Sequence, residues 1–454
     1  MEVSEFTPTC SIIQKLSFGL GHVFNDLCAA MWFSYTLFYL HVVLNISSTT
    51  AGTLLMIGQI VDSIATPLAG WAMDRHGDKK AWHFAGTVAV ALGFSLLFSL
   101  KPIELTASVL TYYLLSIALF QVGWAIVQIA HLSIIPDISR NHRHSSDLTA
   151  IRYTASVCCS ISVYLITWLV LQTGDGTAIG PNDFYKFKEI ALVIVFIGIL
   201  ASLLFYCGLL GTFESEGYEV ITDDVNNLNT TNHDKHFLKQ SIIYMVALTY
   251  VASRLFTILN LIYIPLYLEE RGSLEIVNKD KIRETIATIP LVCYVASFLT
   301  SICLKCRGRC CPDKVTYLIG GTIGLVTSIW LGSGISPGSD SELYAVAIFL
   351  GISGSSTMIA SLCLTASFVK TNGYGGGLVY SVVTFTDKLI SGVVVLLVQN
   401  LQCSPKSLCP HYYEHVLSYI CGLVSLVGLI SLVLLEIEIR RNGRLKRNLE
   451  YINT

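Results

Sequence analysis

Charged side chains are scarce in this chain of 454 residues. Asp, Glu, Lys and Arg make up 13% of it, while 53% of the residues are hydrophobic; soluble domains contain roughly 25% charged residues. This balance excludes a disordered chain, which needs high charge and low hydrophobicity, and it leaves too little polar surface to cover a soluble core. The net charge of −2 provides no basic field for a nucleic-acid partner. The remaining class is a polytopic membrane protein.

Signatures of several other protein classes are missing as well. The 14 cysteines are scattered, so they do not form the framework of a small secreted protein. No HExxH spacing and no phosphate-binding loop is found, which argues against a membrane-embedded enzyme. The polar N-terminus has Lys15 as its only base and no small-residue cleavage site, so we expect no removable signal peptide. We therefore expect no catalytic residues, no cofactor and no resident metal, and we expect a monomer.

Apolar stretches long enough to cross a bilayer, about 20 residues each, are abundant. Reading along the chain, we find twelve of them, with boundaries good to several residues. They cover approximately residues 16–44, 49–73, 81–100, 107–136, 147–171, 189–210, 240–268, 285–304, 315–334, 342–369, 375–399 and 413–436.

The twelve stretches fall into two sets of six, separated by the longest polar stretch of the chain. That stretch, 211–239, carries several carboxylates and an Asn/Thr-rich run, a composition typical of a flexible linker. We predict an all-α membrane protein with an N-terminal six-helix half (1–210), a cytosolic linker (211–239), a C-terminal half (240–437) and a cytosolic basic tail (438–454). Two helical halves of this kind are typical of secondary transporters.

Lysine and arginine are distributed unevenly between the connections. We assign the N-terminus, the even-numbered connections and the C-terminus to one side of the membrane. That side then holds 18 of the 29 basic residues and the other side holds 8, with three inside the spans. The positive-inside rule places both termini in the cytosol. The loop 269–283 is the exception, because its four basic residues fall on the opposite side.

Ionisable side chains inside the spans are the few positions where function is expected. A charge at membrane depth is costly and usually marks a substrate or ion pathway. The spans contain His22, Asp26, Asp62, His131, Arg152, Arg254, Asp387 and Lys388. We interpret them as lining a polar cavity between the halves. The alternative is a set of structural ion pairs, such as Asp26 with Arg152 or Asp62 with Lys388.

The carboxylates of the first two spans are the natural acceptors for a coupling ion. A buried carboxylate beside a base can load and release a proton, so we expect H⁺ coupling through Asp26 and Asp62, with Na⁺ as the alternative ion. His22 shares a helix face with Asp26, and Thr66 shares one with Asp62, since each pair is four residues apart.

Basic, amide and aromatic side chains are the candidates for binding the solute. The guanidinium of Arg152 and the ammonium of Lys388 suit a substrate carboxylate. In the fourth span, polar and aromatic residues recur on one helix face. We expect substrate contacts from Trp124, Gln128, His131, Arg152, Arg254 and Lys388.

The connection after the second span has a recognisable pattern. Residues 70–80 read GWAMDRHGDKK, which resembles the GxxxDRxGxKK signature of the major facilitator superfamily. We expect Gly70 to allow close approach of helices, Gly77 to supply a turn, and Asp74 to cap a helix or form a breakable ion pair. The conformational motif comprises Gly70, Asp74, Arg75, Gly77, Lys79 and Lys80. The alternative is a solvated positive-inside loop.

Other segments resemble the melibiose-permease-type sugar:cation symporters of that superfamily. They are GHVFNDLCAAMWFSYTLFYLHVVL (21–44), GQIVDSIATPLAGW (58–71), LTAIRYTAS (148–156) and TFTDKLISG (384–392). The resemblance implies that Asp26 and Asp62 match acids of that family's cation site, whereas Thr66 replaces a further acid. Gln128 stands where that family has an acid that contacts sugar. These departures favour a proton over Na⁺ and remove part of the sugar site.

The same segments, together with GWAIVQIAHLSIIPD (123–137), are also similar to a lysosomal and melanosomal branch of the superfamily. This resemblance implies cysteine import into lysosomes or pigment organelles. The pattern Tyr218–Ile221 in the linker is compatible with endolysosomal sorting. The alternatives are a symporter for a sugar or another organic solute at the plasma membrane, and a scaffold that does not transport.

Two groups of cysteines stand out by position. Cys403 and Cys409 share the last non-cytosolic loop, where a disulfide is expected if that compartment is oxidising. The cluster Cys303–Cys311 lies at the cytosolic end of a span. Zinc binding, palmitoylation and free thiols are the alternatives for this cluster.

Overall fold

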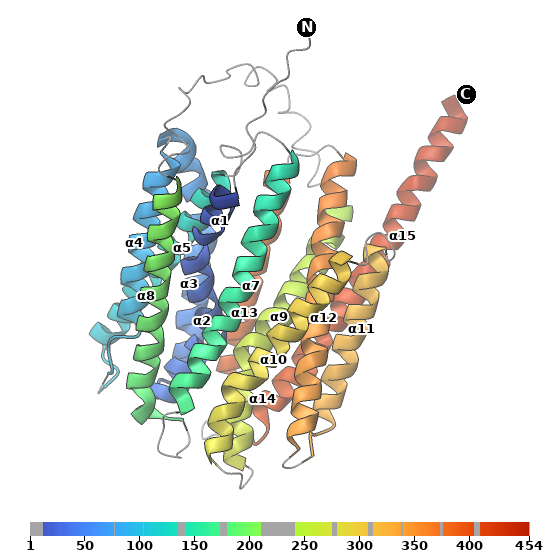
Figure 1. The fold of residues 1–454 in the computed structure, drawn as a ribbon. Coiled ribbons are helices and arrows are strands. Elements are labelled where there is room, and N and C mark those ends of the chain that lie inside the picture. Colours follow the sequence, from blue (N-terminus) through green and yellow to red (C-terminus); the bar gives the residue numbers. More distant parts are fainter. Residues whose placement is uncertain are drawn as a thin grey trace. The chain divides into compact units, whose positions relative to one another are not determined.

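The computed structural model describes residues 12–76, 78–102, 104–134, 142–172, 179–209, 241–274, 279–306, 312–336, 339–372, 376–403 and 409–453. It is all-helical over these residues (Figure 1). Twelve of its helical segments are long and apolar enough to cross a membrane, which confirms the predicted fold class. The observed spans run from 18 to 34 residues, as a bilayer about 30 Å thick requires.

The described residues group into two compact bodies. The first comprises residues up to Trp32, Ile60–Val170 and the stretch from Pro181 to the central linker. The second comprises Phe33–Gln59, Leu171–Gly180 and the chain after the linker. The predicted domain boundaries stay a prediction, since the linker 211–239 lies outside the described residues.

Apart from three stretches that belong to the second body (Phe33–Phe38, Ser48–Gln59 and Leu171–Gln172), the first body contains the helices of the first six spans. They are α1 (Ile12–Leu20), α2 (Val23–Phe38), α3 (Ser48–His76), α4 (Lys79–Leu97), α5 (Ala107–Ser133), α7 (His142–Gln172), the short 3₁₀ turn η2 (Pro181–Asp183) and α8 (Phe184–Leu209). The helices α4, α5 and α8 lie side by side in Figure 1. Phe18, Ile134 and Phe205 form one apolar cluster of this body.

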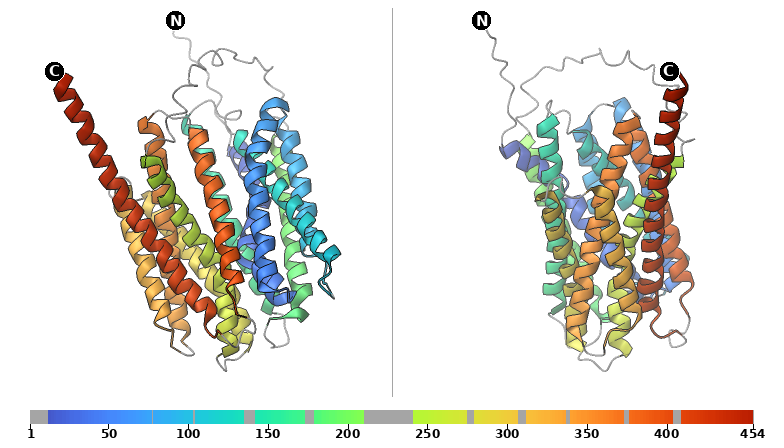
Figure 2. Two further views of the ribbon diagram at one scale, coloured as in Figure 1. Left: turned by 180° about the vertical axis from the view of Figure 1, so that it is seen from behind. Right: turned by 90° about the vertical axis from the view of Figure 1, so that its right-hand side faces the viewer.

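The second body contains the last six spans. Its elements are the π-helical turn η1 (Tyr39–Val43), α9 (Ser241–Leu274), α10 (Lys279–Cys306), α11 (Asp313–Gly332), α12 (Asp340–Asn372), α13 (Gly376–Asn400), α14 (Tyr412–His415), the π-helical turn η8 (Val416–Ile420) and α15 (Cys421–Asn453). The predicted tail is thus largely helical. The end of α15 runs beyond α11 and α12, with which it shares this body (Figure 2).

Small residues bring α4 and α5 into close contact. A Cβ atom added to Gly93 would lie 2.4 Å from the backbone nitrogen of Phe120, and one added to Gly123 would lie 2.7 Å from that of Val90. Helices in a membrane gain little from hydrophobic burial against each other, so close backbone approach and van der Waals contact hold them together. The glycines of this pair therefore set its spacing.

Gly70 does not have the role expected of it. A Cβ atom there would lie 3.9 Å from the nearest side-chain atom, on Ile129, which is ordinary van der Waals contact. The expectation that Gly70 permits close helix approach is wrong, because the side chains around it leave room for a methyl group.

Hydroxyl groups hold the helices of the second body together. The Tyr317 hydroxyl on α11 donates to the backbone carbonyl of Thr249 on α9 at 3.0 Å, and the hydroxyls of Thr249 and Ser431 lie 2.9 Å apart. Lys314 and Glu436 form an ion pair between α11 and α15. Such interhelical bonds satisfy polar groups that have no water to bind inside a bilayer.

The chain between α13 and α14 is tied to the rest of the second body. Cys403 and Cys409 are joined by a disulfide, with Cα atoms 5.9 Å apart. The carboxylate of Glu270 on α9 accepts the backbone N–H groups of Tyr412 and Tyr413, each at 2.8 Å. It thereby caps the first turn of α14, whose amides have no partner within the helix.

The glycine contact between α4 and α5 leads to the first prediction. Gly93→Ala should lower the free energy of unfolding by about 1–3 kcal/mol, the usual cost of overpacking, because the new methyl group meets backbone and not a flexible side chain. Thermal unfolding of the purified protein in detergent measures the loss. Gly70→Ala is the matched control and should leave the unfolding temperature unchanged. Equal stability of the two variants would contradict the packing argument.

Candidate functional site

The first membrane span is broken in its middle. Helix α1 ends at Leu20 and α2 begins at Val23, with a turn at Gly21 and His22 between them. A break of this kind leaves backbone carbonyls without their intrahelical partners. In a membrane those carbonyls must find other donors.

Two histidines from neighbouring helices donate to carbonyls beside the break. The Phe18 carbonyl also accepts the backbone N–H of Gly21 at 3.1 Å. His131 Nε2 on α5 lies 2.8 Å from the Phe18 carbonyl oxygen, and His83 Nε2 on α4 lies 2.9 Å from that of Gly21. A carbonyl only accepts hydrogen bonds, so both imidazoles carry a proton on Nε2. His83 Nδ1 in turn lies 2.7 Å from the Tyr206 hydroxyl, which donates to it when the ring is neutral. Hydrogen bonds thus connect the broken span to α4 and α5, and His83 connects it further to Tyr206 on α8.

His22 occupies the break itself and lies between two charged groups. Its Nδ1 is 3.0 Å from Asp26 Oδ2, and its Nε2 is 3.0 Å from Arg152 Nη2 on α7. A guanidinium only donates, so His22 Nε2 accepts and the proton of the neutral ring is on Nδ1, facing the carboxylate. His22 therefore bridges an anion and a cation.

Nearby amide and indole groups complete this cluster. Asn25 Nδ2 donates to the Trp124 carbonyl at 3.1 Å, and lies 3.5 Å from His22 Nε2. The Asn25 side chain is 1% exposed, and its Oδ1 has no hydrogen-bond partner among the described residues. Trp124 is nearly buried and stacks on Phe120. Asp26 Oδ2 and His22 Nδ1 also lack a hydrogen bond of good geometry among the described residues, in spite of their 3.0 Å separation.

The second predicted acid lies on α3. Asp62 is fully buried, and the Thr66 hydroxyl lies 2.8 Å from its backbone carbonyl and 3.2 Å from its Oδ1. The predicted pairing of these two residues across one helical turn is therefore present. Pro67 follows within α3, which continues to His76.

The remaining predicted substrate residues of the first body are placed as follows. Gln128 is half-buried on α5. His131 is fully buried against Phe18, with ring centroids 4.1 Å apart. Its hydrogen bond to the Phe18 carbonyl stabilises the broken span. A direct contact with solute stays a prediction for these residues.

The second body has its own intramembrane ion pair. Arg254 Nε on α9 lies 3.4 Å from Asp387 Oδ2 on α13, and the Asp387 side chain is only 5% exposed. The Ser391 hydroxyl lies 3.3 Å from the other carboxylate oxygen. Lys388, next to Asp387 in the chain, is half-buried.

The turn after the second span is partly described. Asp78 caps α4 by accepting the backbone N–H groups of Lys80 and Ala81, each at 3.1 Å. Lys79 Nζ donates to the Ser133 carbonyl at 2.8 Å, at the C-terminal end of α5, where a cation is favourable. Arg75 stacks on Trp71, with 4.1 Å from its guanidinium carbon to the ring centroid. Gly77 and the side chain of Asp74 lie outside the described residues.

Of the cysteine cluster at the end of α10, Cys303 has an exposed, free side chain, and the others lie outside what the structure describes. The described side chains include no group of three or more metal-ligating residues.

The structure brings in residues that the sequence did not mark. His83, Tyr206 and Asn25 join the cluster around the broken span. Asp387 was already among the predicted intramembrane charges, but its pairing with Arg254 was not predicted. His83 was not singled out, because it lies at the start of its predicted span, next to the basic residues Lys79 and Lys80.

Comparison with known proteins fits this arrangement. The model of the Major Facilitator Superfamily matches residues 18–393. This chain belongs to that superfamily. It is 35% identical over 95% of its length to 95% of the mouse protein named major facilitator superfamily domain-containing protein 12, and 33% identical to the human protein of that name, over 96% of each chain. An uncharacterized symporter from Synechocystis is 26% identical over 42% of this chain and 36% of its own length.

Solved transporters share the fold. The inward-open xylose transporter XylE from E. coli superposes with a TM-score of 0.65 at 12% identity, over 92% of this chain and 94% of its own. A D-xylose–proton symporter superposes with a TM-score of 0.69 at 12% identity, over 94% and 97%. The chain is therefore a multi-pass membrane transporter of the major facilitator superfamily and not an enzyme.

The ion pair of the second body leads to the second prediction. Asp387→Leu alone leaves the Arg254 guanidinium without its carboxylate and should cost about 1–2 kcal/mol of stability, a range reduced because the arginine is 36% exposed. The double variant Arg254→Met, Asp387→Leu should recover most of that loss. Thermal unfolding of the four proteins of this double-mutant cycle measures the coupling. Additive losses would show that the two side chains do not interact.

Proposed function

We propose that this protein is a secondary active transporter of a small polar solute with a carboxylate, coupled to H⁺ and working by alternating access. The observation that carries the proposal is the position of the His22 imidazole, 3.0 Å from both Asp26 and Arg152. A neutral imidazole there accepts from the guanidinium. With Asp26 ionised, the three groups together carry no net charge. Such a group is tolerable at membrane depth, whereas an uncompensated charge is costly.

Protonation would change this balance in one step. When Asp26 takes a proton, the cluster carries one positive charge, located on Arg152. A substrate carboxylate that binds there restores neutrality, and bidentate binding of carboxylate is what a guanidinium does best. Proton and carboxylate then favour each other's binding, which is the requirement for coupled transport.

The other predicted residues are candidates for proton binding or for contact with the solute. Asp62, with Thr66, is a second candidate for the proton. Arg254, Lys388, Gln128 and Trp124 are candidates for solute contact. We infer no Na⁺ site, because Thr66 stands in place of a further acid and a proton needs only one carboxylate.

Cysteine is the solute that we propose, on the likeness to major facilitator superfamily domain-containing protein 12 over 95% of the chain. The membrane of lysosomes or pigment organelles is the proposed location, with both termini in the cytosol as the distribution of basic residues favours. A zwitterionic amino acid suits a cluster that offers both a cation and an anion. Net direction depends on the sum of the solute and proton gradients, since a carrier runs either way.

A sugar symporter is the second candidate. An isoprimeverose transporter from Lactiplantibacillus pentosus is 23% identical over 45% of this chain. Gln128, in place of an acid, argues against this reading.

The third prediction tests coupling. In proteoliposomes, an inward proton gradient should drive concentrative uptake by the wild type, whereas Asp26→Asn should abolish the response to the gradient and retain solute exchange, because the amide cannot release a proton. Asp62→Asn should reduce the response if this acid shares the proton. Radiolabelled cysteine provides the measurement.

The control is Asp183→Asn, at a buried carboxylate that pairs with Lys186 at 3.3 Å near the start of α8, outside the proposed coupling site. Its uptake should equal that of the wild type. Normal gradient-driven uptake by both Asp26→Asn and Asp62→Asn would refute proton coupling through these acids.

The fourth prediction tests solute and location. Cells that lack the protein should have less cystine in lysosomes or pigment organelles, and re-expression of the wild type, but not of Arg152→Ala, should restore it. Metabolite profiling of purified organelles measures this. An unchanged cystine pool, or a tagged protein found only at the plasma membrane, would favour the alternative readings.

A further inference from the structure

Three histidine rings lie together beside the break in the first span. The ring centroids of His22 and His131 are 5.4 Å apart, and those of His83 and His131 are 6.0 Å apart. His83 and His131 are fully buried and His22 is nearly so. A neutral amide would donate to the carbonyls of the break as well as an imidazole does, so the support of the break does not by itself require histidine.

The middle ring of the three has a nitrogen that no other described group uses. His131 Nε2 donates to the Phe18 carbonyl at 2.8 Å, which leaves a lone pair on Nδ1 of the neutral ring. Nδ1 is buried and has no hydrogen-bond partner among the described residues. A buried acceptor of this kind costs about 1–3 kcal/mol. Because Nε2 stays bonded to the carbonyl, Nδ1 can take up and release a proton without disturbing the bond that supports the span.

The ring of His83 uses its two nitrogens toward different groups. Nε2 donates to the Gly21 carbonyl at 2.9 Å, and Nδ1 accepts from the Tyr206 hydroxyl at 2.7 Å. That hydroxyl also lies 3.3 Å from the hydroxyl of Thr87, and Tyr206 is half-buried. His83 therefore connects the buried cluster with a hydroxyl group that is only partly enclosed.

This connection lies toward one end of the first body. His83 is in the first two turns of α4 and Tyr206 is in the last turn of α8. At the same end, Lys79 of α4 donates to the carbonyl of Ser133, the last residue of α5. The distribution of basic residues favours the cytosol for this end.

The titratable and charged groups around His131 come from the turn in the first span and from the neighbouring helices. His22, His83 and Arg152 are its electrostatic neighbours. Asp26 and Tyr206 lie one contact further, beyond His22 and His83 respectively. An acid thus stands at one end of the row of imidazoles and a hydroxyl at the other.

We propose that the three histidines form a proton relay, which connects Asp26 with Tyr206 and hence with the cytosolic side. Chains of ionisable side chains are the usual means of moving protons through membrane proteins. The nitrogens at these ring separations come within reach through one ring rotation or one bridging water molecule. The relay rests on the proposed function, because it supplies the route by which the coupling proton reaches its acid.

The steps of loading conserve protons and involve no redox chemistry. Tyr206 donates to His83 Nδ1 and is reprotonated from the cytosolic side, while His83 Nε2 gives its proton to His131 Nδ1. His131 passes this proton to His22 Nε2, and His22 Nδ1 gives its own proton to Asp26. Every ring is neutral again afterwards. Release to the same side is the reverse, which returns His83 and His22 to their first tautomers.

Passage of the proton also acts on the solute site. While His22 Nε2 carries a proton it cannot accept from the Arg152 guanidinium, which lies 3.0 Å away. The guanidinium is then free to bind a substrate carboxylate. The relay thereby links arrival of the proton to binding of the solute.

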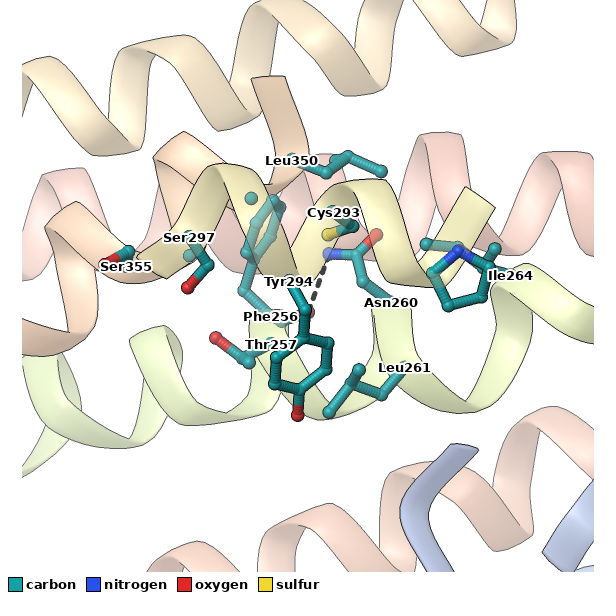
Figure 3. A pocket seen from close by; sticks show the side chains of 13 residues that line it. Phe256, Thr257, Asn260, Leu261, Ile264, Cys293, Tyr294, Ser297, Leu350 and Ser355 are labelled. Carbon is teal, nitrogen blue, oxygen red and sulfur yellow. Dashed lines mark hydrogen bonds between the residues drawn. The ribbon is translucent and has the colours of Figure 1, made fainter. Parts of the chain in front are cut away.

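The cavity of the second body has no such groups. It lies between α9, α10 and α12 and measures about 80 Å³. The described residues that line it include Asn260, Cys293 and Tyr294, but no histidine, carboxylate or basic side chain (Figure 3). None of these three groups takes up a proton near neutral pH. We therefore assign the proton route to the first body.

The test separates the passage of protons from the support of the broken span. His131→Gln retains an amide nitrogen that can donate to the Phe18 carbonyl, but it removes the basic nitrogen. Proteoliposomes report two rates with radiolabelled cysteine: uptake driven by an inward proton gradient, and exchange without a gradient, in which a loaded carrier need not release its proton. The ratio of driven uptake to exchange should fall by about tenfold. This is less than a positioned base usually contributes, because slow conformational steps hide part of the effect.

A second variant leaves the hydrogen bonds of the span in place. Tyr206→Phe removes only the hydroxyl that faces His83 Nδ1, and it should also lower the ratio. The matched control is His41→Asn in the second body, where His41 Nδ1 donates to the Ile46 carbonyl at 3.0 Å and the asparagine amide can replace that bond. This variant should have the wild-type ratio. Thermal unfolding should be the same for all three variants and the wild type.

The outcomes distinguish this proposal from the proposed function. A wild-type ratio in both His131→Gln and Tyr206→Phe would overturn the relay, while loss of the gradient response in Asp26→Asn would still support proton coupling. Equal loss of exchange and driven uptake in His131→Gln, with normal Tyr206→Phe, would show a purely structural histidine and would also overturn it. A wild type that ignores the proton gradient would overturn the proposed function and the relay together.

Discussion

The break in the first membrane span is the feature on which the first body depends. Where α1 ends and α2 begins, the regular hydrogen bonding of the helix is interrupted, and lipid offers no donor in place of water. His131 and His83 provide those bonds from α5 and α4. The break also places His22 off the regular helix, where one ring nitrogen faces Asp26 and the other faces Arg152. A local break of the backbone thus brings together polar side chains from α2, α4, α5 and α7.

The intramembrane charges described in each body form a group with no net charge, and the two groups differ in geometry. In the first body the imidazole of His22 lies between the carboxylate of Asp26 and the guanidinium of Arg152. The electrostatic attraction between the two ions is therefore weaker than in a direct ion pair. In the second body Arg254 and Asp387 face each other directly, with Ser391 on the remaining oxygen. A separated pair responds more readily to a proton or a carboxylate, because neither event must first break a direct ion pair. This difference supports the assignment of coupling to the first body.

The scaffold around these groups is held by small residues and hydroxyls. Glycines let α4 and α5 approach closely, and Tyr317, Thr249 and Ser431 link the helices of the second body. Packing of this kind depends on shape and not on the burial of apolar surface. It fixes the helices within each body rigidly enough for side chains separated by a hundred residues to meet within hydrogen-bond distance.

The sequence by itself determined the membrane class, the twelve spans and the intramembrane charges, because bilayer thickness and the cost of charge in lipid act on composition alone. The sequence also indicated the family, through the motif at residues 70–80 and the acids of the first two spans. Only the tertiary structure decided that His22 bridges Asp26 and Arg152, that His83 belongs to the same cluster, and that Asp387 is the partner of Arg254. Those contacts depend on which faces of helices distant in the sequence pack together. They also depend on the break at Gly21, which changes the direction in which the side chain of His22 points. The spacing of residues along one helix predicts neither the packing of distant helices nor the break in the first span.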